Sequence, residues 1–321
     1  MRAVVKYLII PLLVLFAGDR TMGIILDRLY LKNHCNYNEG ALNEYLAGVA
    51  PDTLIVGTSR AIHMIIPNSI GKSVRVLGQQ QKNLFYHHSV ISLLAQHRKL
   101  PRKVLILNIE VSDLYLENAG RLLQQVSSLS YFYNKNEVVK SYINRIGSYE
   151  PIKYLSSLYR HNSNGVLLFT NPLQNICPSS GDNGYIPLQR GPLDSVRTMS
   201  GLKEDAGKYN YNKINPEFKN SIHKIKKLCD ANSIELIVLN GPYFKPFSNM
   251  IKASGMVSEI VIGENTKYID FVRRPKYRYK SMALWYDHIH LNHEGAKVYS
   301  RDLGMLLKES AAENRSVINK R

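Results

Sequence analysis

The sequence is poor in cysteine, and this shortage excludes two classes of protein. Three cysteines occur in 321 residues, at Cys35, Cys177 and Cys229, and no Cys-x-x-Cys pair is present. An odd number of widely spaced cysteines argues against a disulfide framework and against a thiolate zinc site. We therefore do not expect thiol chemistry to be the function.

Acidic side chains are also scarce relative to basic ones. The chain has 25 Asp and Glu against 42 Lys and Arg, a net charge of +17. A basic surface favours anionic partners, among them nucleic acid, anionic lipid and acidic glycans. Repeats and low-complexity tracts are missing too, and 45% hydrophobic with 21% charged residues is typical of a globular protein rather than a disordered or fibrous one.

The N-terminus lacks an uninterrupted apolar run of the roughly 20 residues that span a membrane. An apolar run at 7–18 follows Arg2 and Lys6, and Asp19 and Arg20 separate it from a second stretch at 22–26. A basic flank before an apolar run is typical of a signal region, and Lys6 can snorkel to the interface. Because no Ala-x-Ala cleavage site follows, we predict an uncleaved membrane anchor at 1–30, with a buried N-terminal helix as the alternative.

The remainder of the chain alternates strand and helix patterns. Runs typical of buried strands lie at 53–57, 74–77, 103–109, 234–240 and 267–271. Helical patterns lie at 83–97, 216–231 and about 294–309, the second with Asn215 as N-cap and Pro216 in its first position. This alternation predicts an α/β fold, a three-layer α/β/α sandwich with a parallel sheet of about five strands. In such sheets, ligands bind beyond the carboxyl ends of the strands.

A segment at about 114–214 interrupts this alternation and is too long for a loop. We interpret it as an insertion that packs over the functional edge of the sheet and contains a helix at 136–146. Its many tyrosines could stack on sugar rings, although packing is the ordinary role of any one of them. Residues 31–321 are thus predicted to form one domain that carries this insertion.

Ser59 follows the first predicted strand and precedes a helical pattern. This places its hydroxyl at a carboxyl end, near a helix N-terminus where backbone N–H groups stabilise negative charge. Taken alone, a helix N-cap is the favoured interpretation of such a serine.

Asp287 and His290 lie near the other end, between the last strand and the last helix. A serine becomes a nucleophile when a base removes its proton, and that base needs a carboxylate to fix its tautomer. Asp287 and His290 can supply both on one turn. A serine after the first strand joined to this Asp-x-x-His is far more specific than either half.

These residues resemble conserved blocks of the SGNH/GDSL hydrolase superfamily, in particular its membrane-anchored bacterial cell-envelope members. The matching segments are Gly57-Thr58-Ser59, Val76-Leu77-Gly78, Pro242-Tyr243, Tyr268-Ile269-Asp270-Phe271 and Asp287-His288-Ile289-His290-Leu291-Asn292. The resemblance implies that Ser59 is the nucleophile, His290 the base and Asp287 the orienting acid. The parallel α/β/α sandwich of the family agrees with the strand pattern.

Two blocks depart from the family pattern, in which a second-block Gly and a third-block Asn complete the oxyanion hole. Here the second block reads Leu77-Gly78-Gln79-Gln80-Gln81, and the third reads Asn108-Ile109-Glu110-Val111. Gly78 and Gln81 are the oxyanion-hole candidates, through backbone N–H groups or the Gln81 amide. A carboxylate at Glu110 repels an oxyanion, so it must point away, be protonated or mark lost activity.

Two further clusters suggest other partners. His288, His290 and His293 invite a metal hypothesis, but no His-Glu-x-x-His motif or cysteine set accompanies them, so we expect no metal or other cofactor. A basic cluster interleaved with tyrosines lies at 273–280. Such a cluster can bind nucleic acid, but beside a membrane anchor it favours acidic glycans or lipid headgroups.

The sequence therefore predicts a membrane-anchored, extracytoplasmic serine ester hydrolase or O-acyltransferase. Its expected substrate is an acylated carbohydrate or lipid of the cell envelope, and no nucleic-acid partner is expected. The main alternative is a catalytically silent envelope binding or assembly protein with the same fold. A metal-dependent hydrolase centred on the three histidines is the third hypothesis.

Overall fold

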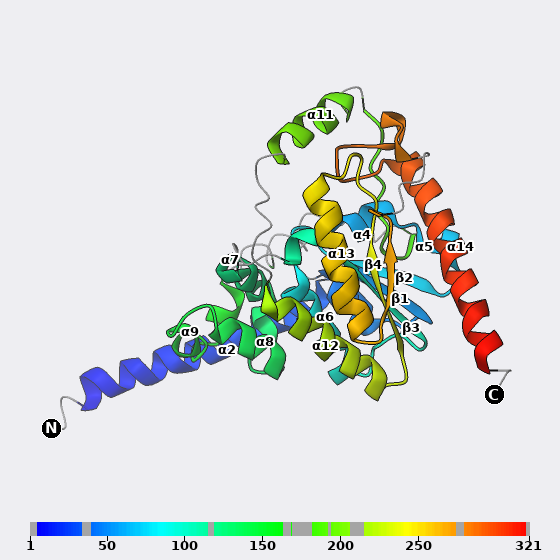
Figure 1. Ribbon diagram of the computed structural model, residues 1–321. Coiled ribbons are helices and arrows are strands. Elements are labelled where there is room, and N and C mark those ends of the chain that lie inside the picture. The colour runs from blue at the N-terminus through cyan, green and yellow to red at the C-terminus, as the bar shows by residue number, and fades with distance from the viewer. Residues whose placement is uncertain are drawn as a thin grey trace. The chain divides into compact units, whose positions relative to one another are not determined.

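The computed structural model describes residues 5–33, 40–114, 119–162, 168, 182–191, 194–205, 215–273 and 279–318 (Figure 1). Contacts divide the chain into two compact units. The first combines Met1–Gly48 with Gly120–Ser179, and the second combines Val49–Ala119 with Ser180–Arg321. The predicted insertion at 114–214 contributes to both units, which are described separately below.

The second unit is built on a five-stranded parallel sheet, as predicted. Its strands are β1 (Thr53–Gly57), β2 (Val74–Gly78), β3 (Val104–Ile109), β4 (Glu235–Asn240) and β5 (Lys267–Asp270), in the order β2-β1-β3-β4-β5. The inner strands are buried almost throughout, because helices cover both faces of a parallel sheet.

Helices lie on the two faces of this sheet, which confirms the predicted α/β sandwich (Figure 1). One layer contains α4 (Ser59–Met64), α5 (Pro67–Ile70) and α14 (His293–Ile318), which pack on one another. The other contains α6 (Leu84–Gln96), α12 (Pro216–Ala231) and α13 (Ser248–Gly263). The step from β1 to β2 runs opposite to the later steps across the sheet, so right-handed crossovers place its helices on the opposite face.

The core on the α14 side of the sheet packs the strands against α4, near the start of the second unit, and against α14, at its end. Ile55, Ile106 and Ile237 align across β1, β3 and β4 and share one face. They belong to one buried cluster with residues of α4 and α14, namely Ala61, Ile62, Met64, Tyr299 and Leu303. This cluster fixes α14 against α4, and with it the segment that precedes α14.

The helices of the second unit differ from the sequence-based prediction in several places. α14 extends to Ile318, well beyond the predicted end near residue 309. α13 was not predicted, although its buried Met250, Ala253, Val257 and Val261 follow helical spacing. α11 (Asp194–Asp205) lies within the predicted insertion. Short 3-10 turns complete the unit at Val111–Leu114, Asp182–Gly184 and Met282–Leu284.

The first unit is helical in the part that the structure describes. Its elements are η1 (Val5–Ile9), α2 (Ile10–Lys32), α3 (Gly40–Ala47), α7 (Ala119–Gln124), η4 (Gln125–Phe132), α8 (Glu137–Asn144), α9 (Glu150–Lys153) and η5 (Tyr159–His161). Asn136 caps the predicted helix α8 by accepting hydrogen bonds from the backbone of Val138 and Val139. The helix over Tyr7–Lys32 is long and apolar enough to cross a membrane.

Tyrosines of the insertion contribute to the interior of this first unit. Tyr133 and Tyr154 stack with ring centroids 3.8 Å apart, and Tyr131 stacks on Tyr30 of α2 at 4.3 Å. All four side chains are buried. Packing therefore accounts for these aromatic rings without a sugar ligand.

Candidate active site

Ser59, His290 and Asp287 form one hydrogen-bonded chain, called here the Ser–His–Asp chain. Ser59 is the first residue of α4, just beyond the carboxyl end of β1, and its Oγ lies 2.8 Å from His290 Nε2. His290 Nδ1 lies 2.8 Å from Asp287 Oδ2. Because the carboxylate accepts a hydrogen bond from Nδ1–H, this pairing leaves Nε2 as the acceptor for the serine hydroxyl.

The carboxylate of Asp287 also shapes the loop that carries His290. Its Oδ1 accepts hydrogen bonds from the backbone N–H groups of Ile289 and His290, at 2.8 and 2.7 Å. An aspartate that binds the backbone two and three residues later closes a tight turn. One side chain therefore sets both the backbone and the ring orientation of His290.

Packing around the same loop holds it in place. Trp285 is fully buried and pairs with Leu291 through an antiparallel bridge. Asn292 Nδ2 donates to the Ala283 carbonyl at 2.8 Å, and its Oδ1 accepts from Gly295 N at 3.0 Å at the start of α14. The loop that presents His290 is thus closed on both sides.

Asp287 is held in its ionised form. Burial opposes ionisation, but the hydrogen bonds from the His290 ring and from the backbone of Ile289 and His290 outweigh it, so the pKa of Asp287 is lowered. The carboxylate therefore stays negative as the pH falls below neutral, and it can stabilise a positive charge on His290.

A second histidine, His63, lies against His290 and was not singled out in the sequence. The two rings meet edge to face with centroids 5.9 Å apart. His63 Nδ1 lies 2.8 Å from the Ile186 carbonyl, and Gln80 Nε2 lies 3.2 Å from its Nε2. Burial lowers the pKa of His63, which favours a neutral ring that does not repel a protonated His290. The available signal was its position one helical turn after Ser59.

Arg60, the residue that follows Ser59 in α4, carries a buried positive charge. It is 1% exposed, and its Nη2 donates to the Pro242 carbonyl at 2.7 Å. Its Cζ lies 3.9 Å from the centroid of the Tyr243 ring, a cation–π contact. A guanidinium away from water exerts a stronger field than one at the surface, and this field favours negative charge nearby.

Gly78 and Gln81, the oxyanion-hole candidates, lie at the carboxyl end of β2 and in the turn beyond it. Gly78 pairs with Gly57 of β1, and a Cβ on Gly78 would lie 2.6 Å from Ile62 Cγ2. A glycine is therefore needed for α4 to approach this strand. Gln81 has a left-handed φ of 58°, a conformation that favours glycine, at the place where the family often has its second glycine.

Glu110, the residue that departs most from the family pattern, has a specific partner beside Ser59. Thr58 Oγ1 donates to Glu110 Oε1 at 2.6 Å and also accepts from Arg60 N at 3.3 Å. The carboxylate is thus held by the residue that precedes Ser59. Burial, reinforced by the Glu110 charge, raises the pKa of the nearby Asp113 well above its usual range.

The other two histidines of the last block have separate partners. His293 Nδ1 lies 2.9 Å from the Tyr185 hydroxyl, and the His288 carbonyl accepts from Phe244 N at 3.2 Å. Within the described ranges, no group of three His, Cys, Asp or Glu side chains is arranged to hold a metal ion.

Two remaining sequence features are covered only in part. Of the basic cluster at 273–280, residues 274–278 lie outside the described residues, and Arg273 Nε pairs with Asp270 at 3.0 Å. Cys35 and Cys177 also lie outside them, whereas Cys229 is buried in α12. Burial raises the pKa of the Cys229 thiol to about 12, which disfavours a reactive thiolate.

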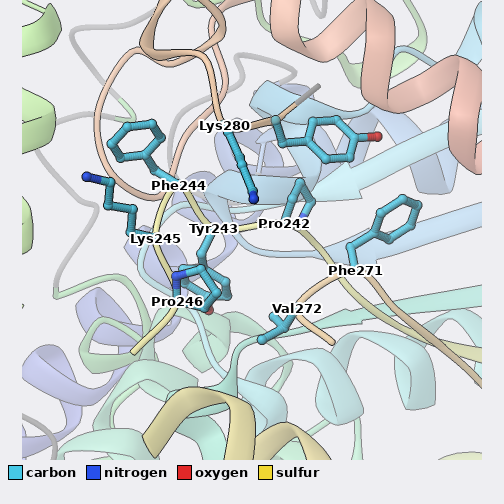
Figure 2. Close-up of a pocket in the computed structure, with 9 residues that line it drawn as sticks. Pro242, Tyr243, Phe244, Lys245, Pro246, Phe271, Val272 and Lys280 are labelled. Atoms are coloured by element: carbon cyan, nitrogen blue, oxygen red, sulfur yellow. The ribbon is translucent and has the colours of Figure 1, made fainter. Parts of the chain in front are cut away.

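A cavity of about 410 Å³ opens beyond the carboxyl ends of β4 and β5 (Figure 2). Its walls are mostly apolar, with two lysines: Pro242, Tyr243, Phe244, Lys245, Pro246, Phe271, Val272, Tyr279 and Lys280. Two of these wall residues connect to the Ser–His–Asp chain, because Tyr243 stacks on Arg60 and Phe244 N binds the His288 carbonyl. The cavity is therefore in contact with α4, which carries Ser59, and with the loop that carries Asp287 and His290.

Comparison with protein-family models and with curated proteins gives no match to this sequence. Among solved structures, the chain is similar to a proposed acylhydrolase from Bacteroides fragilis, with 10% identity and a TM-score of 0.41 over 84% of this chain and 93% of that one. It is also similar to a proposed platelet activating factor from Streptococcus pneumoniae, with 10% identity and a TM-score of 0.40 over 89% and 99%. At this identity, neither similarity assigns a family or an activity.

The contacts of Arg60 predict a loss of stability when the guanidinium is replaced. We expect Arg60→Lys to lower the free energy of unfolding by about 2 kcal/mol, because an ammonium cannot reproduce both the planar stacking on Tyr243 and the charged hydrogen bond to Pro242. Urea unfolding followed by circular dichroism measures the change. Arg301→Lys, at an exposed position of α14, is the matched control. Equal stability of the two variants would contradict this account of Arg60.

Proposed function

We propose that this protein is a serine-dependent ester hydrolase or O-acyltransferase with Ser59 as its nucleophile. The Ser–His–Asp chain carries the proposal, with 2.8 Å between Ser59 Oγ and His290 Nε2 and 2.8 Å between His290 Nδ1 and Asp287 Oδ2. These are the contacts that activate a serine hydroxyl. The resemblance to the SGNH/GDSL superfamily assigns the same roles to the same three residues.

The reaction follows from where the proton can go. Ser59 Oγ attacks the ester carbonyl while its proton passes to His290 Nε2, and Asp287 stabilises the resulting imidazolium. Collapse of the tetrahedral intermediate breaks the bond to the alcohol, which leaves with the proton from His290. The acyl group remains on Ser59. Attack by water with His290 as base then gives a hydrolase, and attack by a sugar hydroxyl gives an O-acyltransferase.

The negative oxygen of the tetrahedral intermediate needs nearby positive charge or N–H donors. Gly78 and Gln81 are the candidate donors in this proposal, through the backbone at the end of β2. The buried guanidinium of Arg60, the residue after Ser59, adds a positive field in this proposal. The bond from Thr58 to Glu110 gives the unfavourable carboxylate a partner other than the substrate.

The substrate proposed is an acylated carbohydrate or lipid of the cell envelope. The apolar cavity with its two lysines and the net charge of +17 suit an acylated anionic molecule. The helix over Tyr7–Lys32 supports membrane attachment, with the second unit on the extracytoplasmic side. We propose no nucleic-acid partner, because the basic residues of such a protein face envelope polymers and headgroups.

One observation favours a second candidate function, a silent envelope binding or assembly protein. The Glu110 carboxylate is hydrogen-bonded to Thr58, the residue before Ser59, and the third block lacks the Gly-x-Asn-Asp motif of the family. A protein with a defective oxyanion hole keeps the fold and the Ser–His–Asp chain but does not turn over ester. Reactivity of Ser59 separates the two candidates.

Covalent labelling with a fluorophosphonate tests the nucleophile. Only an activated serine reacts quickly with this probe, so wild-type protein should label and Ser59→Ala should abolish both labelling and esterase turnover. Ser69→Ala, which removes an exposed hydroxyl from α5, should label like the wild type. Labelling of Ser59→Ala at the wild-type rate removes Ser59 from the mechanism, and an unreactive wild type favours the silent protein.

Substitutions in the last block separate the triad from the metal hypothesis. His290→Ala should be nearly as damaging to kcat as Ser59→Ala, and Asp287→Asn should lower kcat by a factor on the order of 10⁴, because the wrong histidine tautomer results. His293→Ala should have a mild effect, and chelators none. The assay is ester hydrolysis with one substrate throughout. Loss of activity on chelation, with a dispensable Ser59, would overturn the triad.

A further inference from the structure

The N-terminal helix has two parts with different surroundings. Between Tyr7 and Phe16, the exposed apolar side chains are Tyr7, Leu8, Ile9, Ile10, Leu12, Leu13, Val14, Leu15 and Phe16. From Asp19 onward, by contrast, one face is covered, because Gly23, Leu26 and Tyr30 are buried at helical spacing. The first part is free to contact lipid on every side, whereas the second part packs on the protein.

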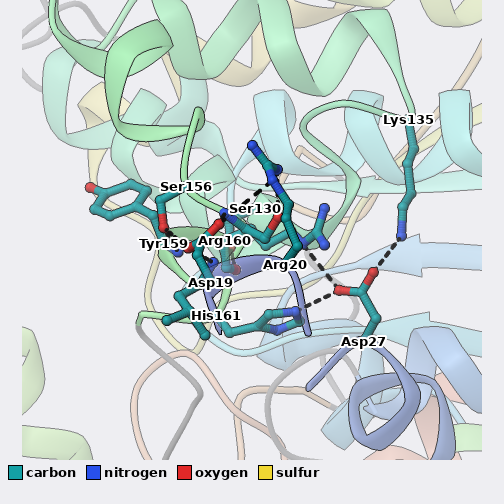
Figure 3. A network of polar contacts seen from close by, with 11 residues as sticks. Asp19, Arg20, Asp27, Ser130, Lys135, Ser156, Tyr159, Arg160 and His161 are labelled. Atoms are coloured by element: carbon teal, nitrogen blue, oxygen red, sulfur yellow. Dashed lines mark hydrogen bonds and ion pairs between the residues drawn. The ribbon is translucent and has the colours of Figure 1, made fainter. Parts of the chain in front are cut away.

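Charged residues mark the boundary between these two parts (Figure 3). The Asp19 carboxylate accepts from the backbone N–H groups of Ser157 and Leu158, at 2.8 and 3.2 Å. Arg20 donates from Nη1 to Ser157 Oγ at 2.6 Å and from Nη2 to the Leu155 carbonyl at 2.8 Å. These four polar contacts fasten α2 to residues 155–158.

Two turns further along α2, Asp27 makes a second set of polar contacts. It accepts from His161 Nε2 at 2.7 Å and pairs with Arg160 Nε at 3.0 Å and Lys135 Nζ at 3.7 Å (Figure 3). Charged groups in hydrocarbon are costly, so this face of the helix must stay against the protein, although Met22, Ile24, Ile25 and Leu31 remain exposed. The part of α2 that lipid can surround on every side therefore ends at about residue 18.

A span that ends there is short. At about 1.5 Å per residue, residues 7–18 cover roughly 18 Å, against about 30 Å of hydrocarbon. A short span is accommodated by local thinning of the bilayer and by snorkelling of flanking residues. Both draw the protein that follows the helix onto the membrane surface.

Residues 149–158 present apolar side chains at this boundary, and we call them the 149–158 surface. Tyr149 is 74% exposed, Ile152 62% and Leu155 68%, and Leu158 is also exposed. Single exposed apolar residues are ordinary, but here four occur within ten residues. Leu155 and Leu158 belong to the backbone that binds Asp19 and Arg20, so the surface is continuous with the apolar part of α2.

The character of the flanking residues matches a lipid interface. Tyr149 is the amphipathic kind of side chain enriched at headgroup level. Lys153 lies in α9 among the apolar residues and pairs with Glu150 at 2.6 Å, and the Arg20 side chain is 44% exposed beside them. Basic side chains at the membrane surface are attracted by anionic headgroups.

From these contacts we propose that the 149–158 surface inserts its apolar side chains into the headgroup region of the bilayer that α2 enters. The occupant of this surface is lipid, because the surface continues the lipid-facing part of α2 and carries basic residues at its edge. The inference rests on the proposed membrane attachment of α2 and is independent of the chemistry at Ser59. It gives the protein a second membrane contact, which restricts rotation of the first unit about the helix.

Fluorescence quenching by brominated lipid tests this contact in the full chain. The protein is reconstituted into vesicles of phosphatidylcholine and phosphatidylglycerol, with or without bromine on the acyl chains, and tryptophan is introduced by Ile152→Trp or Leu155→Trp. The native Trp285 is fully buried in the second unit, and the unsubstituted protein gives its background. We expect emission from both variants to be quenched at least twofold more than from the control.

The control is Asn134→Trp. Asn134 is exposed and is next to Lys135, which pairs with Asp27. Asp27 lies about 12 Å further along α2 than Asp19, so this tryptophan should stay clear of the bromines. Leu12→Trp reports the anchor itself. If Leu12→Trp is quenched but Ile152→Trp and Leu155→Trp are quenched no more than Asn134→Trp, the second contact alone is overturned. Absence of quenching at Leu12→Trp would overturn the attachment of α2 as well. Fluorophosphonate labelling of the same variants reads out the proposed chemistry separately.

Discussion

The packing of α14 against α4 is the contact on which the candidate site depends. Ser59 begins α4 and the Asp287–His290 loop ends at the start of α14, so neither residue reaches the other unless these two helices meet. The buried cluster under them, with Tyr299 and Leu303 from α14, fixes that approach, and Ser300 Oγ accepts from the Ile66 backbone at 2.7 Å. Ser59 and His290, which are 231 positions apart, meet because burial of this apolar cluster brings the two ends of the second unit's sequence together.

The polar groups around Ser59 then divide into those that favour negative charge at the serine and one that opposes it. Arg60, the residue after Ser59, is a buried cation, and hydrogen bonds that outweigh its burial keep Asp287 ionised behind His290. Glu110 is the opposing group, bonded to Thr58. In a region of low dielectric these charges act strongly on one another. Whether the site can stabilise an oxyanion therefore depends on the balance of these charges rather than on the fold.

The strands of the sheet and the residues of the Ser–His–Asp chain were predictable from the sequence, whereas the surroundings of the site depend on tertiary contacts. The strands were found because short aliphatic, β-branched runs are typical of buried strands. Ser59 was joined to His290 through the chemistry of a serine, histidine and aspartate, and through a resemblance that covers most of residues 51–310. The burial of Arg60 was not predictable, since it needs the Pro242 carbonyl and the Tyr243 ring from another strand end. α13 was missed because serines and glycines interrupt its apolar pattern. Asp19 marked an interruption of the apolar run in the sequence, but its partners lie in the insertion.

The most direct test of the central claim is to trap the acyl group on the protein. Wild-type protein is mixed with an activated ester such as p-nitrophenyl acetate, quenched in acid within the first turnover and digested, and the peptides are sequenced by mass spectrometry. The account predicts an acetyl group on the Ser59 side chain that is lost when quenching is delayed after the ester is exhausted. Rapid turnover with no acylated Ser59, or with the acyl group on a different residue, would contradict it.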